Sequence, residues 1–259
     1  MSFNPFDETI NALADLGGQR VWSLMVTIFG DLAQSKGSTI EGPVLSAILA
    51  DMDIRPEAVR VALHRLRNDG WIASSKTGRT SLHSLTEVGR AQSAAASWRI
   101  YAKPGLEGPR WQLAILEDAT TVTRNLMLDH GFAPLMSRVY IGGAHATAPV
   151  GSLVLPGDAV PDWLCQQFAP EDLAQDYAAL YRVLSRAEQT LTDPGMLIPR
   201  QVAVLRCLVV HNWRRIVLKH PDLPPALFPT SWDGPRCQEL VHTLLTRFVR
   251  PDLGTILRG

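Results

Sequence analysis

The chain has 259 residues, of which 46% are hydrophobic, and its 25 lysines and arginines balance 25 aspartates and glutamates. This length allows sizeable cores in two or three domains, and the zero net charge excludes a chain that is basic or acidic throughout. No stretch is apolar enough to span a bilayer and no secretory signal is visible, so we expect no membrane partner. The cysteines, Cys165, Cys207 and Cys237, lack paired metal spacing, which predicts reduced thiols in a cytoplasmic protein.

Two apolar helices are predicted before residue 55. Residues 21–29 are apolar on nearly all sides, which predicts a helix buried within a core. Residues 44–49 predict a short amphipathic helix, and residues 51–54 provide a turn of suitable length before a second helix.

That second helix is predicted from Pro56 to near Gly70, with a basic exposed face. Pro56 suits a first helical position, and Gly70 suits the left-handed residue that ends many helices. The apolar positions recur every three or four residues and predict a buried stripe, made of Val59, Ala62, Leu63 and Leu66. The candidate DNA-contacting residues lie before the helix or on its opposite face: Arg55, Glu57, Arg60, Val61, His64, Arg67 and Asn68. Arg60 is the first choice, because an arginine in the N-terminal half can donate two parallel hydrogen bonds to guanine.

A hairpin with a basic tip is predicted next. Residues 71–76 and 79–85 read as strands joined at Thr77 and Gly78. Lys76 and Arg79 flank the tip, where they can meet phosphate oxygens or enter a minor groove. Such charges on an isolated hairpin are usually only solvated. Here the hairpin directly follows a basic helix, and that order is typical of a winged helix-turn-helix that binds double-stranded DNA, which we expect within residues 1–103.

The basic residues are concentrated in this part of the chain. Residues 55–103 contain nine lysines and arginines against three acidic residues, a local net charge of +6. A concentrated positive charge favours a nucleic-acid partner. A membrane surface is less favoured, because the basic helix has no broad apolar face to insert.

A domain boundary is predicted at residues 103–109, where two prolines and two glycines break regular structure. Before it, Thr86 can cap a helix that runs to about Tyr101. The sequence leaves open whether this helix is a dimer contact or a connector.

The fold class expected for the whole chain is α+β. Residues 109–160 predict a ferredoxin-like domain with strands near 111–116, 137–141 and 151–155 and a helix at 119–129. Residues 161–259 predict a mainly helical C-terminal domain with a regulatory role, with helices at 162–168, 172–190, 199–218 and 235–248.

Two blocks of the chain resemble the PaaX family of bacterial transcriptional repressors. The first block consists of Arg20-Val21-Trp22-Ser23, Phe29-Gly30-Asp31, Ala58-Val59-Arg60, Arg65-Leu66, Gly70-Trp71-Ile72, Gly78-Arg79-Thr80-Ser81 and Leu85-Thr86-Glu87-Val88-Gly89. The second consists of Val210-His211-Asn212-Trp213-Arg214-Arg215, His220-Pro221-Asp222-Leu223-Pro224 and Pro229-Thr230-Ser231-Trp232-Asp233-Gly234. One departure is Lys36-Gly37-Ser38 followed by Ile40-Glu41, where many members have Arg-Gly-Gly followed by Ile-Trp.

The resemblance implies a homodimeric repressor that binds an imperfect palindrome in operator DNA. It also implies release by an aryl-acyl-CoA effector, phenylacetyl-CoA in the best-known members, and hence a link to phenylacetate catabolism. An acyl-CoA requires cations for its phosphates and a ring for its adenine, so the candidate effector-binding residues are His211, Trp213, Arg214 and Arg215. The arginines can equally stabilise a helix C-terminus, and His211 can equally pair with Asp222 or Asp233.

A nuclease is the alternative hypothesis, because the resemblance includes similarity to small CRISPR-associated nucleases. Asp118, at the end of the first central strand, would then hold a metal ion in a dimer. A single carboxylate per chain is a weak basis, since divalent cations gather several oxygen ligands, and Asp118 also suits a helix N-terminus. No other catalytic or cofactor motif is found, so we expect a protein that is not an enzyme and needs no cofactor.

Overall fold

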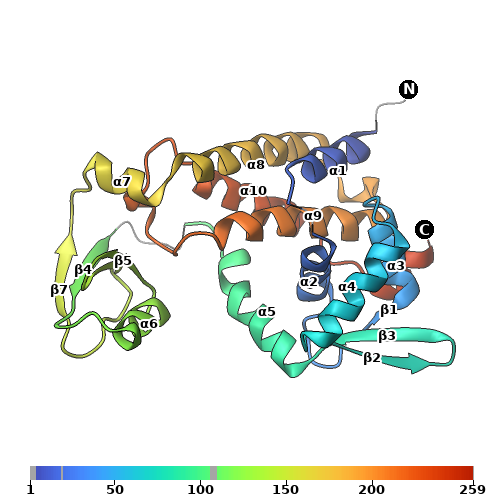
Figure 1. Ribbon diagram of the computed structural model, residues 1–259. Coiled ribbons are helices and arrows are strands. Elements are labelled where there is room, and N and C mark those ends of the chain that lie inside the picture. Colours follow the sequence, from blue (N-terminus) through green and yellow to red (C-terminus); the bar gives the residue numbers. More distant parts are fainter. Residues whose placement is uncertain (1–3, 19, 106–109, 259) are drawn as a thin grey trace. The chain divides into compact units, whose positions relative to one another are not determined.

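The computed structural model describes residues 4–18, 20–105 and 110–258 (Figure 1). The chain divides into two compact units. The first consists of Met1–Ala102, Ala179–Arg215 and Cys237–Gly259, and the second of Lys103–Ala178 and Ile216–Arg236. The C-terminal region 161–259 is therefore shared between both units instead of forming one continuous unit. The predicted linker is described only for residues 103–105, and its residues 106–109 lie outside the described ranges.

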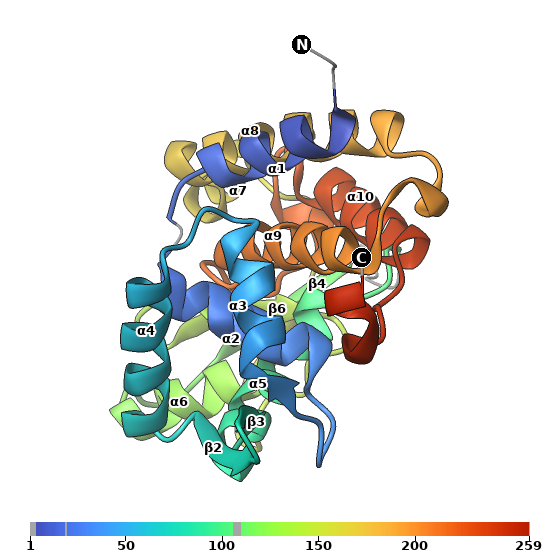
Figure 2. The same ribbon diagram turned by 90° about the vertical axis from the view of Figure 1, so that its right-hand side faces the viewer.

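The N-terminal part of the first unit contains five helices and a three-stranded antiparallel sheet. In chain order these are α1 (Pro5–Asp15), α2 (Val21–Leu32), β1 (Ile40–Glu41), α3 (Gly42–Ala50), α4 (Pro56–Asn68), β2 (Ile72–Thr77), β3 (Thr80–Leu85) and α5 (Glu87–Ile100). The sheet order is β1-β3-β2, and its hairpin pairs Ile72 with Leu85 and Thr77 with Thr80. Figure 2 shows α3, α4 and the hairpin on one side of this unit.

The predicted elements of this part are confirmed in position, and two elements were not predicted. Strand β1 has only two residues, too short for a recognisable pattern. Helix α1 begins with Asn4, whose side chain caps the backbone N–H of Phe6, and buries Phe6, Ile10 and Leu13. Its Asn cap and its apolar spacing are both standard signals of a helix.

Helix α9 (Pro199–Val217) forms the centre of the first unit, and Figures 1 and 2 both show it between α1 and α8 (Glu171–Thr190) on one side and α2 on the other. Residues 202–213 of α9 are buried without exception. The Asn212 side chain donates to the carbonyl of Leu13 in α1 at 3.0 Å, which ties the N-terminal helix to this core. Helix α10 (Gly234–Arg247) and the 3₁₀ segment η3 (Leu253–Arg258) complete the C-terminal part.

The second unit contains a four-stranded antiparallel sheet with one covering helix. Its elements are β4 (Trp111–Ile115), α6 (Thr121–Asp129), β5 (Phe132–Met136), β6 (Val139–Gly143) and β7 (Leu153–Gly157). The strand order β5-β6-β4-β7 is that of a ferredoxin-like sheet, and Met127 of α6 packs on its core of Ala114, Phe132 and Tyr140. The complete ferredoxin-like arrangement has a second crossover helix, whereas residues 144–152 form turns. The α+β class is confirmed, and the strand prediction needs three corrections: β5 was missed, the strand expected at 137–141 is Val139–Gly143, and the strand expected at 151–155 is Leu153–Gly157.

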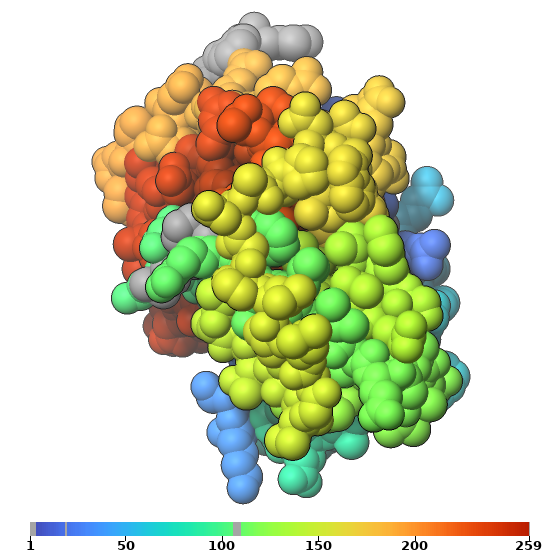
Figure 3. Space-filling model, turned by 90° about the vertical axis from the view of Figure 1, so that its left-hand side faces the viewer, coloured from blue at the N-terminus to red at the C-terminus, as the bar shows by residue number. Residues whose placement is uncertain are grey.

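The second unit also contains helix α7 (Asp162–Phe168), the 3₁₀ turn η2 (Pro225–Leu227) and a cluster of aromatic side chains. The Tyr177 hydroxyl lies 2.7 Å from Nε2 of His220, and the rings of Phe228 and Trp232 stack at 4.9 Å. Figure 3 shows edge strand β7 at the surface, where Leu153, Val154 and Leu155 are exposed.

A buried ion pair joins four helices or their ends in the first unit. Arg206 of α9 donates two hydrogen bonds of 2.8 Å to Asp31 of α2, and also donates to the carbonyls of Leu245 and Phe248 at the end of α10. Tyr101, which follows α5, donates to the same carboxylate at 2.9 Å. Burial acts to raise the pKa of Asp31, but the bonds from Arg206 outweigh it and hold that pKa below its ordinary value. Its contribution to stability is therefore present at neutral pH and lost as the pH falls through the lowered pKa.

We predict that Arg206→Met lowers the free energy of unfolding by about 3 to 5 kcal/mol, because it leaves the Asp31 carboxylate buried without its main partner. Urea unfolding of the full chain at pH 7 would measure the loss. The matched control is Arg186→Met, which breaks an exposed pair with Glu8 and should cost less than about 1 kcal/mol. Equal losses for the two variants would contradict the central role of Asp31.

Candidate functional site

Helix α4 presents a basic face because its apolar side is fixed against the first unit. Pro56 starts the helix, Glu57 lies in its first turn, and Arg65 and Arg67 lie in its last turn, where each charge suits the helix dipole. Val59, Ala62 and Leu66 are buried, whereas Leu63 of the predicted stripe is only half-buried. Gly70 has a φ of +71°, as predicted for the residue that ends the helix.

All seven candidate residues on and before α4 are exposed, namely Arg55, Glu57, Arg60, Val61, His64, Arg67 and Asn68. The Arg60 side chain is 75% exposed and makes only a long contact of 3.5 Å with Glu57. Such a surface pair contributes little to stability, so the guanidinium remains available to another partner. Asn68 and His64 contact each other at 3.3 Å.

A groove runs between α3, α4 and the hairpin, with a volume of about 750 Å³. It brings together four of the candidate side chains, those of Arg60, His64, Arg67 and Arg79. Lys76 is exposed on β2 but does not line this groove. Gly78, with a φ of +61°, makes the tight hairpin turn that carries Arg79.

Polar residues that the sequence analysis did not select also line the groove. Ser46, Thr80 and Ser81 add hydroxyl groups, which can bind phosphate oxygens. His83 lies beneath them, buried and bonded to Ser74 at 2.8 Å. Burial and the nearby Arg67 lower the pKa of His83, so this imidazole is neutral at pH 7. Serine and threonine are too common for the sequence alone to distinguish them.

The start of α5 is attached to the junction of α4 and β2. Thr86 caps α5 at Gly89 and also donates to the carbonyls of Gly70 and Trp71. A Cβ atom at Gly89 would lie 2.2 Å from the Trp71 carbonyl oxygen, so only glycine permits this approach. Arg90 donates to the carbonyl of Leu85 at 2.7 Å. Helix α5 therefore cannot shift without disturbing the α4–β2 junction.

The four candidate effector-binding residues are engaged inside the first unit. Trp213 is buried and donates to the carbonyl of Ile100 at 3.0 Å, and His211 is buried with its Nδ1 3.5 Å from the Thr27 hydroxyl. Arg214 donates to Ser23 and Thr27 of α2, and Arg215 donates to the carbonyl of Leu16 after α1. The alternative pairing of His211 with Asp222 or Asp233 stays a prediction, and the contact found for its Nδ1 is the Thr27 hydroxyl.

This environment is better suited to joining helices than to holding a large ligand. Burial, together with Arg214 and Arg215, lowers the pKa of His211 to about 4, so its imidazole is uncharged at pH 7. The cavity that Arg214 lines has a volume of about 40 Å³, comparable with one water molecule. Effector binding by these four residues stays a prediction, and it would require their present contacts to open.

Asp118 is exposed and lies before α6, whose N-terminus is capped by Thr120 and Thr123 instead. Among the described residues, no group of three or more histidines, cysteines, aspartates or glutamates could hold a metal ion. No contact among the described residues supports the nuclease alternative. All three cysteines are free thiols. Within the described ranges, no helix has the length and apolarity needed to cross a membrane.

Comparisons with known proteins agree with the two blocks of motifs. Residues 20–89 match the family described as "PaaX-like protein", and residues 168–252 match the "PaaX-like protein C-terminal domain". The chain is similar to the transcriptional repressor PaaX of Escherichia coli K12. The two sequences are 26% identical, and their alignment covers 87% of this chain and 79% of that protein.

A solved structure, the uncharacterized protein Rv0674 from Mycobacterium tuberculosis, is similar in fold, with a TM-score of 0.51 and 19% identity over 87% of this chain and 94% of that one. At this identity the likeness concerns the fold alone. Because two family segments match in order along one chain, and because the alignment with the E. coli repressor spans most of both proteins, this chain belongs to the PaaX family.

Proposed function

We propose that this protein is a sequence-specific, DNA-binding transcriptional repressor. The observation that carries the proposal is the exposed basic face of α4 beside the basic hairpin, with Arg60, Arg67 and Arg79 on one groove. The order α3, α4, β2, β3 is that of a winged helix-turn-helix, in which the second helix enters the major groove. The similar protein from E. coli is named a transcriptional repressor, which supports the same function here.

In this proposal the active form is a cytoplasmic homodimer whose two α4 helices fit successive major grooves of a palindromic operator. An aryl-acyl-CoA such as phenylacetyl-CoA releases the operator. By linkage, such an effector must bind the DNA-free form more tightly than the DNA-bound form.

A gel-shift titration with DNA from upstream of the protein's own gene and its neighbours tests the proposal. We expect specific binding that phenylacetyl-CoA releases and that phenylacetate and CoA leave intact. Specific binding that ignores all three compounds would retain the repressor and discard this effector. The absence of specific binding would contradict the proposed function itself.

We predict that Arg60→Ala weakens operator binding by about 1 to 3 kcal/mol and relaxes the preference at one base pair, as expected for loss of a bidentate guanine contact. Binding to a set of operators, each with one substituted base pair, measures both effects. The control is Arg65→Ala, because Arg65 lies over the Trp22 ring at 5.4 Å and pairs with Asp69 instead of lining the groove. An unchanged base preference in Arg60→Ala would show that α4 does not recognise the DNA sequence through this residue.

Lys76→Ala and Arg79→Ala should weaken binding about equally on all sequences, because hairpin cations contact phosphates. Each variant should reduce the slope of log affinity against log salt by about 1, which fluorescence anisotropy between 50 and 300 mM salt would measure. The same reduction is not expected for Arg186→Ala, whose exposed cation lies outside the α4 groove. A change of base preference without a change of salt slope would contradict the phosphate assignment.

A further inference from the structure

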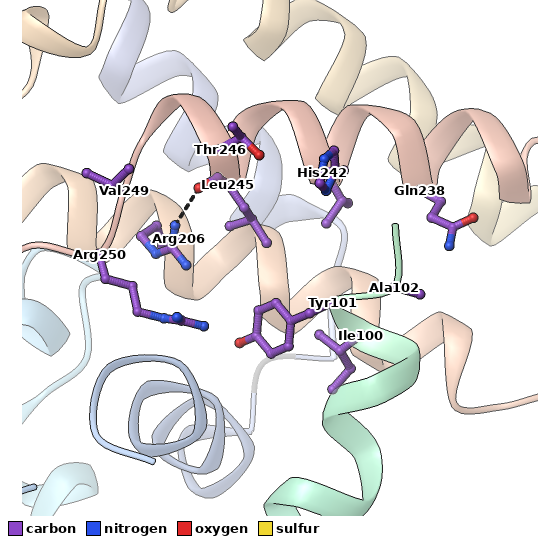
Figure 4. Close-up of a pocket in the computed structure, with 11 residues that line it drawn as sticks. Ile100, Tyr101, Ala102, Arg206, Gln238, His242, Leu245, Thr246, Val249 and Arg250 are labelled. Atoms are coloured by element: carbon purple, nitrogen blue, oxygen red, sulfur yellow. Dashed lines mark hydrogen bonds between the residues drawn. The ribbon is translucent and has the colours of Figure 1, made fainter. Parts of the chain in front are cut away.

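We propose that a cavity at the end of α5 is the effector site, and that it binds an anionic group of the effector together with an adjoining apolar group. The cavity has a volume of about 370 Å³ and lies within the first unit (Figure 4). This inference rests on the proposed function and places the regulation of that function away from residues 211–215.

One face of α10 forms most of the wall. The lining residues of this helix recur at i, i+3, i+4, i+7 and i+8, as one helical face requires: Gln238, Val241, His242, Leu245 and Thr246. Ile100, Tyr101 and Ala102 line the opposite side. The wall thus combines aliphatic side chains with a few polar groups, which is the usual composition of a small-molecule site, and its volume lies in the range of such sites.

The charge of the cavity favours an anion. Asp31 already receives two hydrogen bonds from Arg206, so a second cation, Arg250, gives the cluster one excess positive charge. Arg250 is 52% exposed and holds Asp31 by one bond of 3.2 Å. Figure 4 shows its guanidinium extending toward Tyr101, and it lies 5.3 Å from that ring. A carboxylate or phosphate can therefore pair with Arg250 without taking Arg206 from Asp31.

The cavity is also connected to the proposed DNA-binding surface through α5. The C-terminal end of this helix is held by the bond from Trp213 to the Ile100 carbonyl and by the bond from Tyr101 to Asp31. Its N-terminal end is fixed to the α4–β2 junction by Thr86. A ligand that draws Arg250 from Asp31 and Tyr101 changes the contacts at one end of α5, and α5 conveys the change to α4. Two sites that bias one element are coupled in free energy.

Isothermal titration calorimetry of the full chain, without DNA, tests the site. The probes are phenylacetyl-CoA, phenylacetate and CoA. Binding of phenylacetate would identify a carboxylate as the anion and would contradict the expectation that phenylacetate leaves the operator complex intact, whereas binding of the CoA compounds alone would identify a phosphate. The pocket variants are Arg250→Gln and Thr246→Glu, the second of which places a carboxylate in the cavity. Their matched controls are Arg186→Gln, which also loses a partly exposed ion pair, and Thr243→Glu on the same helix outside the cavity.

We expect both pocket variants to bind the active probe at least about tenfold more weakly, because Arg250→Gln loses one charge-assisted hydrogen bond and Thr246→Glu places a like charge beside the anion. Both controls should stay within about twofold of the wild type. Thermal melting shows whether a variant is folded, and Thr246→Glu keeps the test valid if Arg250→Gln is unstable. Wild-type affinity in both pocket variants would overturn the inference, as would failure of all three probes to bind. Ligand binding that depends on Arg250 in a protein that binds no operator would instead retain the site and reject the repressor.

Discussion

The carboxylate of Asp31 is the constraint on which the first unit depends. A buried charge is costly unless it is paired and hydrogen-bonded, and each partner of Asp31 comes from a different part of the chain. Arg206 comes from α9, Tyr101 from the end of α5 and Arg250 from the residues after α10. Satisfying one charge therefore fixes the positions of four segments. Separating Asp31 from these partners would leave its charge buried and unpaired, at a large cost in free energy. The same cost keeps these N-terminal and C-terminal segments together in the first unit.

The arginines of the first unit fall into two groups, inward-turned and exposed. Arg206 and Arg214 are turned inward and join helices, whereas Arg60 and Arg79 are exposed at the groove. An inward arginine is held by carbonyls, hydroxyls or carboxylates, so its guanidinium is not accessible to a polyanion. An exposed arginine remains hydrated and mobile, which is the state from which phosphate and base contacts form with counterion release. The basic surface that we assign to DNA consists of cations that are not engaged in the core.

The same division explains why the exposed face of α4 was easier to predict from the sequence than the surroundings of the C-terminal arginines. The elements around α4 depend on local signals: Pro56 at its start, and Gly70 and Gly78 at positive φ after it. Strand β5 was missed because Pro134 lies inside it, and proline argues against a strand unless the strand is at an edge. The structure places β5 at the edge of its sheet, where the missing N–H costs no ladder bond. An edge position is a property of the sheet and not of the segment.

The sequence by itself determined the family, the α+β class, most helix boundaries and the exposed face of α4, because capping, periodicity and turn residues act within a few residues of the chain. Only the tertiary structure decided what the C-terminal arginines contact. Arg206 meets Asp31 across 175 positions, and Trp213 meets Ile100 across 113. The cavity beside Arg250 is assembled from the end of α5 and one face of α10 in the same way. Burial and long-range pairing are decided by the packing of the whole chain, and no local pattern records them.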